Sequence, residues 1–297
     1  MILHYRIHEV SEYINWIYFF HAWGFQPRFA GIADIHGCDA CRALWLARFP
    51  EEDRAKAAEA MQLHKEALRM LDRLDERYRT HAIVRLAEAN AEGNDLRLDG
   101  MRFPLLRQQT VRQEGEPFLC LSDFVRPKES GIPDRVGIFA ATVDEDMERA
   151  FVRDPYLQLL AQTLADRLAE ATAEKLHETV RKEIWGYAPD EHLSVRRLHN
   201  EEYRGIRPAV GYPSLPDQSA NFLIDRLLDM KRIGITLTHN GMMKPHASVS
   251  GLMFAHPAAR HFSVGRIDEA QLEDYARRRG MNKETMRKFL AANIQSL

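Results

Sequence analysis

The segment GIRPAVGYPSLPDQS, residues 205 to 219, places three prolines and two glycines between two stretches with helical patterns. Proline fixes φ and has no backbone N–H, so neither an α-helix nor a central strand can run through this segment. Gly205 and Gly211 allow the backbone to pass close to another part of the molecule. We expect a stiff segment that keeps its shape without a hydrogen-bonded ladder and presents Arg207, whose guanidinium offers a fork for a carboxylate or a phosphate. An ordinary proline-rich loop is the alternative from these residues alone.

The rest of the chain combines helical and β patterns, which predicts an α+β fold. Helical patterns cover residues 8–22, 50–78, 155–185, 268–279 and 283–294, with Gly280 as a stop signal between the last two. The β patterns cover a hairpin within 81–100, turning over Gly93-Asn94-Asp95, and the short runs 234–238, 248–255 and 261–264. We expect an N-terminal helical layer, residues 1–80, packed on a larger unit, residues 81–297, as one continuous globular unit.

The charge balance and the cysteines exclude several classes of protein. The chain has 41 basic and 43 acidic side chains, so its net charge of -2 gives no field that would attract nucleic acid or an anionic membrane. No apolar run approaches the roughly 20 residues of a membrane span, and the N-terminus lacks the apolar core of a signal peptide. We expect a cytoplasmic protein with three reduced cysteines and no structural disulfide.

The sequence HGCDAC contains His36, Cys38 and Cys41. Two thiols in a C-x-x-C spacing with a nearby histidine are suited to a metal site or a redox dithiol. A strong zinc prediction needs a second such pair, and the sequence has none. We therefore expect no metal and two incidental thiols on a helical turn, with a metal or redox site as the alternative.

An acidic row follows the helical pattern 155–185 at four-residue steps: Asp166, Glu170, Glu174 and Glu178. At 3.6 residues per turn this row drifts round the helix by about 40° per step. It is typical of a solvated face, and the alternative is a wall that faces a cation.

Five blocks in a fixed order carry a resemblance to a known family. They are LSDFVRPKESG at 121–131, LADRLAEATAEKLHETVRKEIWGYAP at 164–189, RPAVGYP at 207–213, ASVSGLMFAHP at 247–257 and EDYARRRGM at 273–281. Together they resemble the activation domain at the C-terminus of cobalamin-dependent methionine synthase. The resemblance implies a C-shaped, mainly antiparallel sheet with flanking helices that binds S-adenosylmethionine. It also implies a task, which is to present this methyl donor to cob(II)alamin while flavodoxin or a similar reductase supplies an electron.

The resemblance also implies the site residues. Arg207 is expected to meet the carboxylate of the cofactor and Asp123 its amino group, while Glu170 and Glu201 align with positions near the cofactor. Tyr212 either packs on the cofactor or braces the turn. No side chain is expected to act as a general acid or base. These residues agree with the charges of S-adenosylmethionine. Its carboxylate is suited to a basic side chain, and its sulfonium and ammonium groups are suited to several acidic ones.

The chain departs from the family pattern at the cofactor site and at the expected docking surface. His261 and Phe262 stand where the family has a Tyr-Tyr pair beside the cofactor, so one aromatic face remains without the phenols. His239 and Asn240 replace two residues of an L-T-E-S motif, and Lys244 replaces a tryptophan before proline. The latter changes lie near the surface expected to meet the corrinoid.

The modules that accompany this domain in a full methionine synthase are not recognisable in the sequence. DIHGCD, Asp34 to Asp39, begins like a cobalt-ligating D-x-H-x-x-G loop but lacks its glycine. Cobalamin is therefore expected only through a partner, a cobalamin-binding methionine synthase or a related corrinoid protein. The chain would act in trans as a free-standing reactivation subunit of a methyltransferase system. A sensor or assembly protein that binds S-adenosylmethionine without methyl transfer is the alternative.

Overall fold

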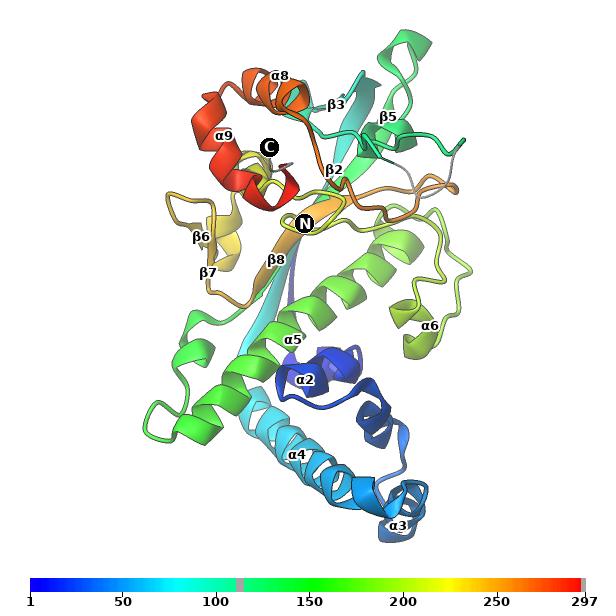
Figure 1. The fold of residues 1–297 in the computed structure, drawn as a ribbon, viewed down its shortest axis with the longest axis vertical. Coiled ribbons are helices and arrows are strands. Elements are labelled where there is room, and N and C mark those ends of the chain that lie inside the picture. Colours follow the sequence, from blue (N-terminus) through cyan, green and yellow to red (C-terminus); the bar gives the residue numbers. More distant parts are fainter. Residues whose placement is uncertain (111–114, 295–297) are drawn as a thin grey trace.

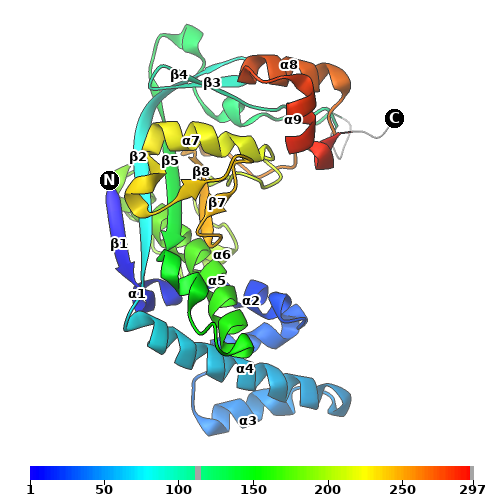
Figure 2. The same cartoon turned by 90° about the vertical axis from the view of Figure 1, so that its left-hand side faces the viewer.

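The computed structural model describes residues 1–110 and 115–294 and has a curved, mainly antiparallel sheet at its centre (Figure 1). Strands β4, β3, β2, β5 and β8 are hydrogen-bonded in that order, and β1 also pairs with β2. The strands are β1 (Ile2–Arg6), β2 (Arg79–Glu92), β3 (Asp95–Leu98), β4 (Met101–Pro104), β5 (Asp134–Val143) and β8 (Ser248–Met253). A separate hairpin consists of β6 (Thr236–Leu237) and β7 (Met243–Lys244). Seen from the side, the chain has the C-shaped outline that the resemblance implied (Figure 2).

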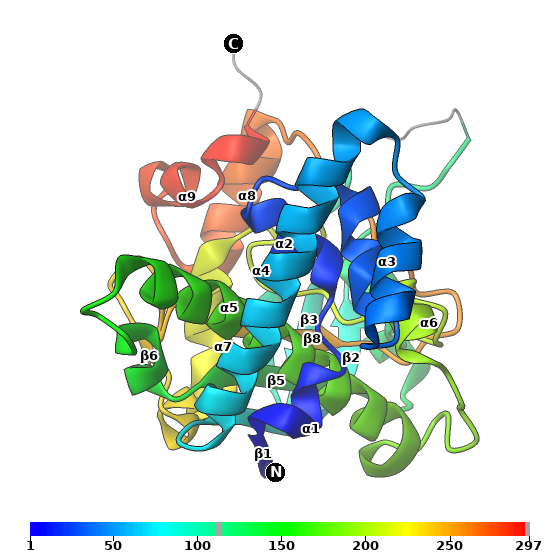
Figure 3. The ribbon, with the colours of Figure 1, turned by 90° about the horizontal axis from the view of Figure 1, so that it is seen from below.

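Helices flank both faces and both ends of this sheet. They are α1 (Ile7–Ser11), α2 (Trp16–Ala22), α3 (Asp39–Ala47), α4 (Glu51–Asp75), α5 (Pro155–Thr179), α6 (Val195–His199), α7 (Asn221–Leu228), α8 (Glu269–Arg279) and α9 (Lys283–Phe289). The view from below shows α3 beside α4 (Figure 3). In the described part of the chain, no helix combines the length and the apolar character needed to cross a bilayer.

Two apolar clusters lie on opposite faces of the sheet, and β5 contributes to both. Phe139 and Ala141 belong to the cluster that contains α5 and the N-terminal helices, whereas Ile138 and Ala140 belong to the cluster that contains α7. Successive side chains of a strand point to opposite faces, so β5 is a central strand buried on both sides. The N-terminal layer therefore shares a core with the sheet, and the predicted boundary near residue 80 stays a prediction.

The structure confirms the α+β class and most of the expected elements. The pattern 50–78 corresponds to α4, the hairpin within 81–100 to β2 and β3, and the pattern 155–185 to α5 with a π-helical turn at Val180–Ile184. Gly280 ends α8 with a φ of 66°, the left-handed conformation expected of a helix-ending glycine.

Two expected elements are wrong, and four strands were not predicted. The pattern 8–22 is interrupted before Asn15, whose side chain accepts a hydrogen bond from the Ile17 backbone N–H and caps α2. Residues 261–264 form no strand. This stretch is fastened instead to the proline-rich segment, since the Val264 N–H donates to the Pro213 carbonyl and the Ser214 hydroxyl donates to the Phe262 carbonyl. Strands β1, β4, β5 and β7 had no recognised signal in the sequence.

The proline-rich segment 205–219 lies along β8, so the expectation that it forms no ladder is wrong. The Ile206 and Phe254 backbones exchange N–H···O bonds of 3.0 and 2.9 Å, and the Val210 N–H donates to the Ser250 carbonyl at 2.9 Å. Pro208, which has no N–H, contributes only its carbonyl, which accepts from the Leu252 N–H at 3.1 Å. The missing N–H of Pro208 removes one bond from this ladder, a loss that is tolerated at the edge of a sheet. The segment therefore holds Arg207 against the sheet.

Gly251→Ala is expected to destabilise the protein by about 1–3 kcal/mol, the range for overpacking. A Cβ at Gly251 would lie 2.2 Å from the Pro208 carbonyl oxygen and 2.9 Å from the Ala209 Cα, which are backbone atoms with no rotamer to change. Urea denaturation measures the loss. Gly31→Ala is the matched control, because its Cβ would meet only the Trp45 indole nitrogen at 3.7 Å. Equal stability of the two variants would contradict the close packing of the segment on β8.

Candidate functional site

A pocket of about 600 Å³ lies between α5, the segment 199–214 and residues 261–263. Its volume is in the range of small-molecule sites. Six of the seven predicted site residues line it: Glu170, Glu201, Arg207, Tyr212, His261 and Phe262. They come from three stretches far apart in the sequence, and the fold brings these stretches together around one pocket.

Arg207 is fixed beneath this pocket by α5. Its guanidinium donates to the Ala173 carbonyl at 2.7 Å and to the Glu174 carboxylate at 3.0 Å. Burial disfavours its charge, but Glu174, Tyr203 and Glu170 outweigh burial and raise the pKa of Arg207 above its ordinary value. Arginine has five N–H donors, and these two bonds use two of them, so the fork keeps donors for an anionic group.

Tyr212 and Glu170 meet across the mouth of the pocket. The Tyr212 hydroxyl donates to a Glu170 carboxylate oxygen at 2.7 Å, and Tyr212 is 51% exposed. Partial burial and the neighbouring Glu170 charge raise the pKa of Tyr212, so the phenol stays protonated and donates. Both suggested roles for Tyr212, packing on a ligand and bracing the turn, are compatible with this position.

His261 and Phe262 form the opposite side. His261 Nε2 lies 3.6 Å from a carboxylate oxygen of Glu201, a residue with a φ of 57°. Burial lowers the pKa of His261 and Arg207 lowers it further, against the opposing effect of Glu201, so the imidazole is neutral near pH 7. Phe262 packs against Phe124 with ring centroids 6.5 Å apart.

Asp123 does not line the pocket. It lies in the short 3-10 helix Leu121–Phe124, and its carboxylate accepts two bonds from Arg107, of 2.6 and 2.8 Å, and one from the Cys120 N–H of 2.8 Å. Its nearest link to the pocket is the adjacent Phe124, which contacts Phe262. Its expected role toward an amino group stays a prediction.

Three residues of the acidic row on α5, Glu170, Glu174 and Glu178, are buried or hydrogen-bonded to other side chains and do not form a solvated face. Glu174 is buried, Glu170 is half-buried against Tyr212, and Glu178 accepts a 2.7 Å bond from the Tyr13 hydroxyl. The solvated-face interpretation is therefore wrong for these three residues. Two of them, Glu170 and Glu174, line the pocket and give it the negative charge that would favour a cationic ligand.

A buried polar layer continues below the pocket along the same face of α5. His177 is fully buried, and its ring meets the Tyr203 ring edge-on at a centroid distance of 4.9 Å. The Arg181 guanidinium lies over the Tyr203 ring, 4.2 Å from its centroid. Burial, with Arg207 and Arg181 nearby, lowers the pKa of His177 well below its ordinary value. Neither His177 ring nitrogen has a hydrogen-bond partner among the described residues, nor does Glu174 Oε1. These unpartnered polar atoms are buried; Glu174 lines the pocket, whereas His177 does not.

Sequence reasoning missed the pocket residues supplied by the N-terminal layer. Tyr13, Asn15 and Tyr18 line the pocket together with His199, whose ring contacts the Tyr13 carbonyl at 2.9 Å. The stretch around these residues had been interpreted as a buried helix. The hydroxyl groups of the two tyrosines were the sequence signal against complete burial of this stretch.

The departures on the expected docking surface lie away from the pocket. His239 and Asn240 are in the turn between β6 and β7, and Lys244 ends β7; all three are exposed. None of them lines the pocket, so they cannot contact a ligand bound in it.

Comparisons with known proteins agree with this geometry. A family model described as "Vitamin B12 dependent methionine synthase, activation domain" matches residues 6–280. A solved structure described as "Crystal Structure of the MetH Reactivation Domain bound to AdoHcy" is 38% identical in sequence to this chain and superposes with a TM-score of 0.85. That alignment covers 100% of this chain and 90% of the other.

Proposed function

Because this chain belongs to the activation-domain family of vitamin B12-dependent methionine synthases, we propose that it binds S-adenosylmethionine and supports reductive methylation of cob(II)alamin on a separate protein. The observation that carries the proposal is the pocket in which the Arg207 fork faces the carboxylates of Glu170, Glu174 and Glu201. The relative whose structure is described as bound to AdoHcy supports a ligand of this chemical class.

The pocket residues fit the charges of S-adenosylmethionine. Arg207 would hold the carboxylate of the ligand, and the surrounding glutamates would favour its sulfonium and ammonium groups. Phe262 offers an aromatic face, and the neutral His261 can donate or accept one hydrogen bond there. Asp123 lies outside the pocket lining, and its proposed bond to the amino group rests on the family resemblance.

The work of this chain would consist of binding and positioning. Bound S-adenosylmethionine would supply the methyl group and leave as S-adenosylhomocysteine. One electron from a flavodoxin-like reductase would reduce cob(II)alamin on the partner to the cobalt nucleophile that accepts this methyl group. Arg207 and the α5 glutamates would hold the donor in line with the cobalt of the partner, which can supply a large part of the rate enhancement. No proton transfer is required. The docking must be reversible, because the same corrinoid face has to be free during ordinary turnover.

The test combines this protein with a corrinoid-binding domain of a methionine synthase in the cob(II)alamin state. S-adenosylmethionine and a reduced flavodoxin are added, and the absorbance change to methylcobalamin is followed. We expect methylation to depend on this protein. The same rate without it, across several corrinoid partners, would exclude reactivation. Ligand binding without methylation would favour a sensor or an assembly protein.

A further inference from the structure

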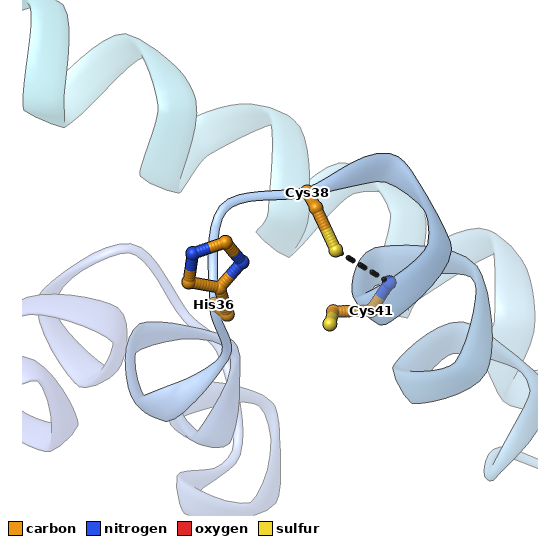
Figure 4. A group of neighbouring side chains, drawn as sticks. All are labelled: His36, Cys38 and Cys41. Atoms are coloured by element: carbon orange, nitrogen blue, oxygen red, sulfur yellow. Dashed lines mark hydrogen bonds between the residues drawn. The ribbon is translucent and has the colours of Figure 1, made fainter.

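Three metal-ligating side chains converge on the N-terminal layer, outside the pocket described above. They are His36, Cys38 and Cys41, and one ligand atom of each lies within 4.8 Å of the other two (Figure 4). His36 is exposed and both cysteines are half-buried. Figure 4 shows the imidazole facing the two sulfurs across a common space. The sequence could not show this, because the C-x-x-C spacing alone does not place the histidine.

The local backbone explains why the two sulfurs are held together. Cys38 is the N-cap of α3, with φ -78° and ψ 152°, and its Sγ accepts a hydrogen bond from the Cys41 N–H at 3.2 Å. Cys41 follows in the first turn of the helix, where a residue three positions after the cap lies near it. His36 arrives from the connection between α3 and the 3-10 helix Pro27–Asp34. The three ligand atoms of His36, Cys38 and Cys41 therefore approach one point from both sides of the start of α3.

We infer that His36, Cys38 and Cys41 form a binding site for a divalent metal ion that prefers sulfur and nitrogen ligands, with Zn²⁺ the best match. Zn–S bonds of about 2.3 Å and Zn–N bonds of about 2.0–2.1 Å put tetrahedral ligand atoms about 3.6–3.8 Å apart. The ligand atoms, within 4.8 Å of one another, reach this spacing by side-chain movements of about 1 Å. Two thiolates and an imidazole disfavour Mg²⁺ and Ca²⁺, which take oxygen ligands.

The site has three protein ligands and one open coordination position. Within residues 1–110 and 115–294, no fourth histidine, cysteine or acid joins this group. Water or a small ligand would therefore occupy the remaining position of a tetrahedral ion. None of the three residues lines the pocket around Arg207, so this site is separate from the proposed cofactor site.

A redox dithiol is the competing interpretation of a C-x-x-C at a helix start. A disulfide would join only the two sulfurs, and His36 would then act only as a neighbouring polar group beside the thiols. The third donor, placed within the same 4.8 Å, is the observation that favours a metal. The proposal departs from the expectation from the sequence that the two thiols are incidental.

The experiment titrates the reduced, metal-free full chain with Co²⁺ and follows the thiolate-to-cobalt charge-transfer absorption, with Zn²⁺ competition to obtain the zinc affinity. We expect one metal ion per chain. His36→Ala, Cys38→Ser and Cys41→Ser should each weaken binding by at least about 100-fold, beyond the loss typical of changes outside the ligand shell. Cys120→Ser is the matched control, because Cys120 is buried in the other apolar cluster and should leave binding unchanged.

Circular dichroism of each metal-free variant verifies that it is folded before its affinity is compared. Zn²⁺ should raise the melting temperature of the wild type and of Cys120→Ser but not of the three ligand variants. Equal Co²⁺ affinity in wild type and the cysteine variants would overturn the proposal. Unchanged affinity in His36→Ala would exclude the three-ligand site. A Cys38–Cys41 disulfide in the purified protein, with no metal uptake after reduction, would establish the dithiol instead.

Discussion

Replacing Arg207 by methionine is expected to lower the free energy of unfolding by about 3–5 kcal/mol, the effect of breaking a buried ion pair from one side. The Arg207 and Glu174 side chains are only 13% and 10% exposed. Glu174 Oε1 has no hydrogen-bond partner among the described residues, so the carboxylate depends on Arg207 for compensation. Without the guanidinium, a charged group would be left in the interior of the molecule.

The double variant Arg207→Met/Glu174→Met separates this explanation from a simple packing defect. Because it removes both charges, it should recover most of the stability lost in the single variant. Arg197→Met is the control, since Arg197 pairs with Glu202 on the exposed surface and should change stability little. Denaturant unfolding gives all the values. A double variant as unstable as Arg207→Met would refute the role of the unpaired carboxylate.

Arg207→Lys is expected to weaken S-adenosylmethionine binding by about 1.5–3 kcal/mol, which is roughly 10- to 150-fold in Kd. Lysine keeps the positive charge beside Glu174, so the fold should persist, but it lacks the planar fork that binds a carboxylate through two N–H groups. The comparison thus isolates ligand recognition from the stabilising ion pair. Arg207→Ala would not separate the two effects, because it would also remove the buried charge that pairs with Glu174.

Isothermal calorimetry on the folded variant measures this effect. The matched control is Arg204→Lys, because Arg204 bonds the Ala255 carbonyl at 3.0 Å, close by in the sequence, and does not line the pocket. We expect the control to bind as the wild type does. The same affinity in Arg207→Lys would remove Arg207 from the recognition of the ligand.

The long helices were predictable because their apolar residues recur at helical spacing over many turns, as in α4 and α5. Strand β5 was not predictable in this way. Its residues from Val136 onward are all buried, so they show no alternation of apolar and polar positions. Gly137, Ala140 and Ala141 also have low strand propensity. The strand forms because its neighbours bury it on both faces, which is information that local sequence lacks.

The candidate site was predicted unevenly for a related reason. Three of its residues, Glu170, Arg207 and Tyr212, lie in sequence blocks that resemble the family. Glu201, His261 and Phe262 lie outside these blocks, and the pocket contains all six. The positions of the Tyr13 and Tyr18 phenols in the pocket depend instead on how the N-terminal layer packs on α5. The hydrogen bond from Tyr13 to Glu178 is one contact of this kind. Asp123 was expected in the site from its block, whereas its pairing with Arg107 could only be seen in three dimensions.

The interruption of the helical pattern before Asn15 changes the directions in which the Tyr13 and Tyr18 side chains point. In an unbroken helix, Tyr13 and Tyr18 would be five residues apart, which at 100° per residue puts their side chains about 140° apart around the axis. Two rings so far apart could not face one ligand. Because the chain changes direction between α1 and α2, both tyrosines line the same pocket. An irregularity of four residues thus gives a short segment two aromatic contacts that a regular helix would have pointed in different directions.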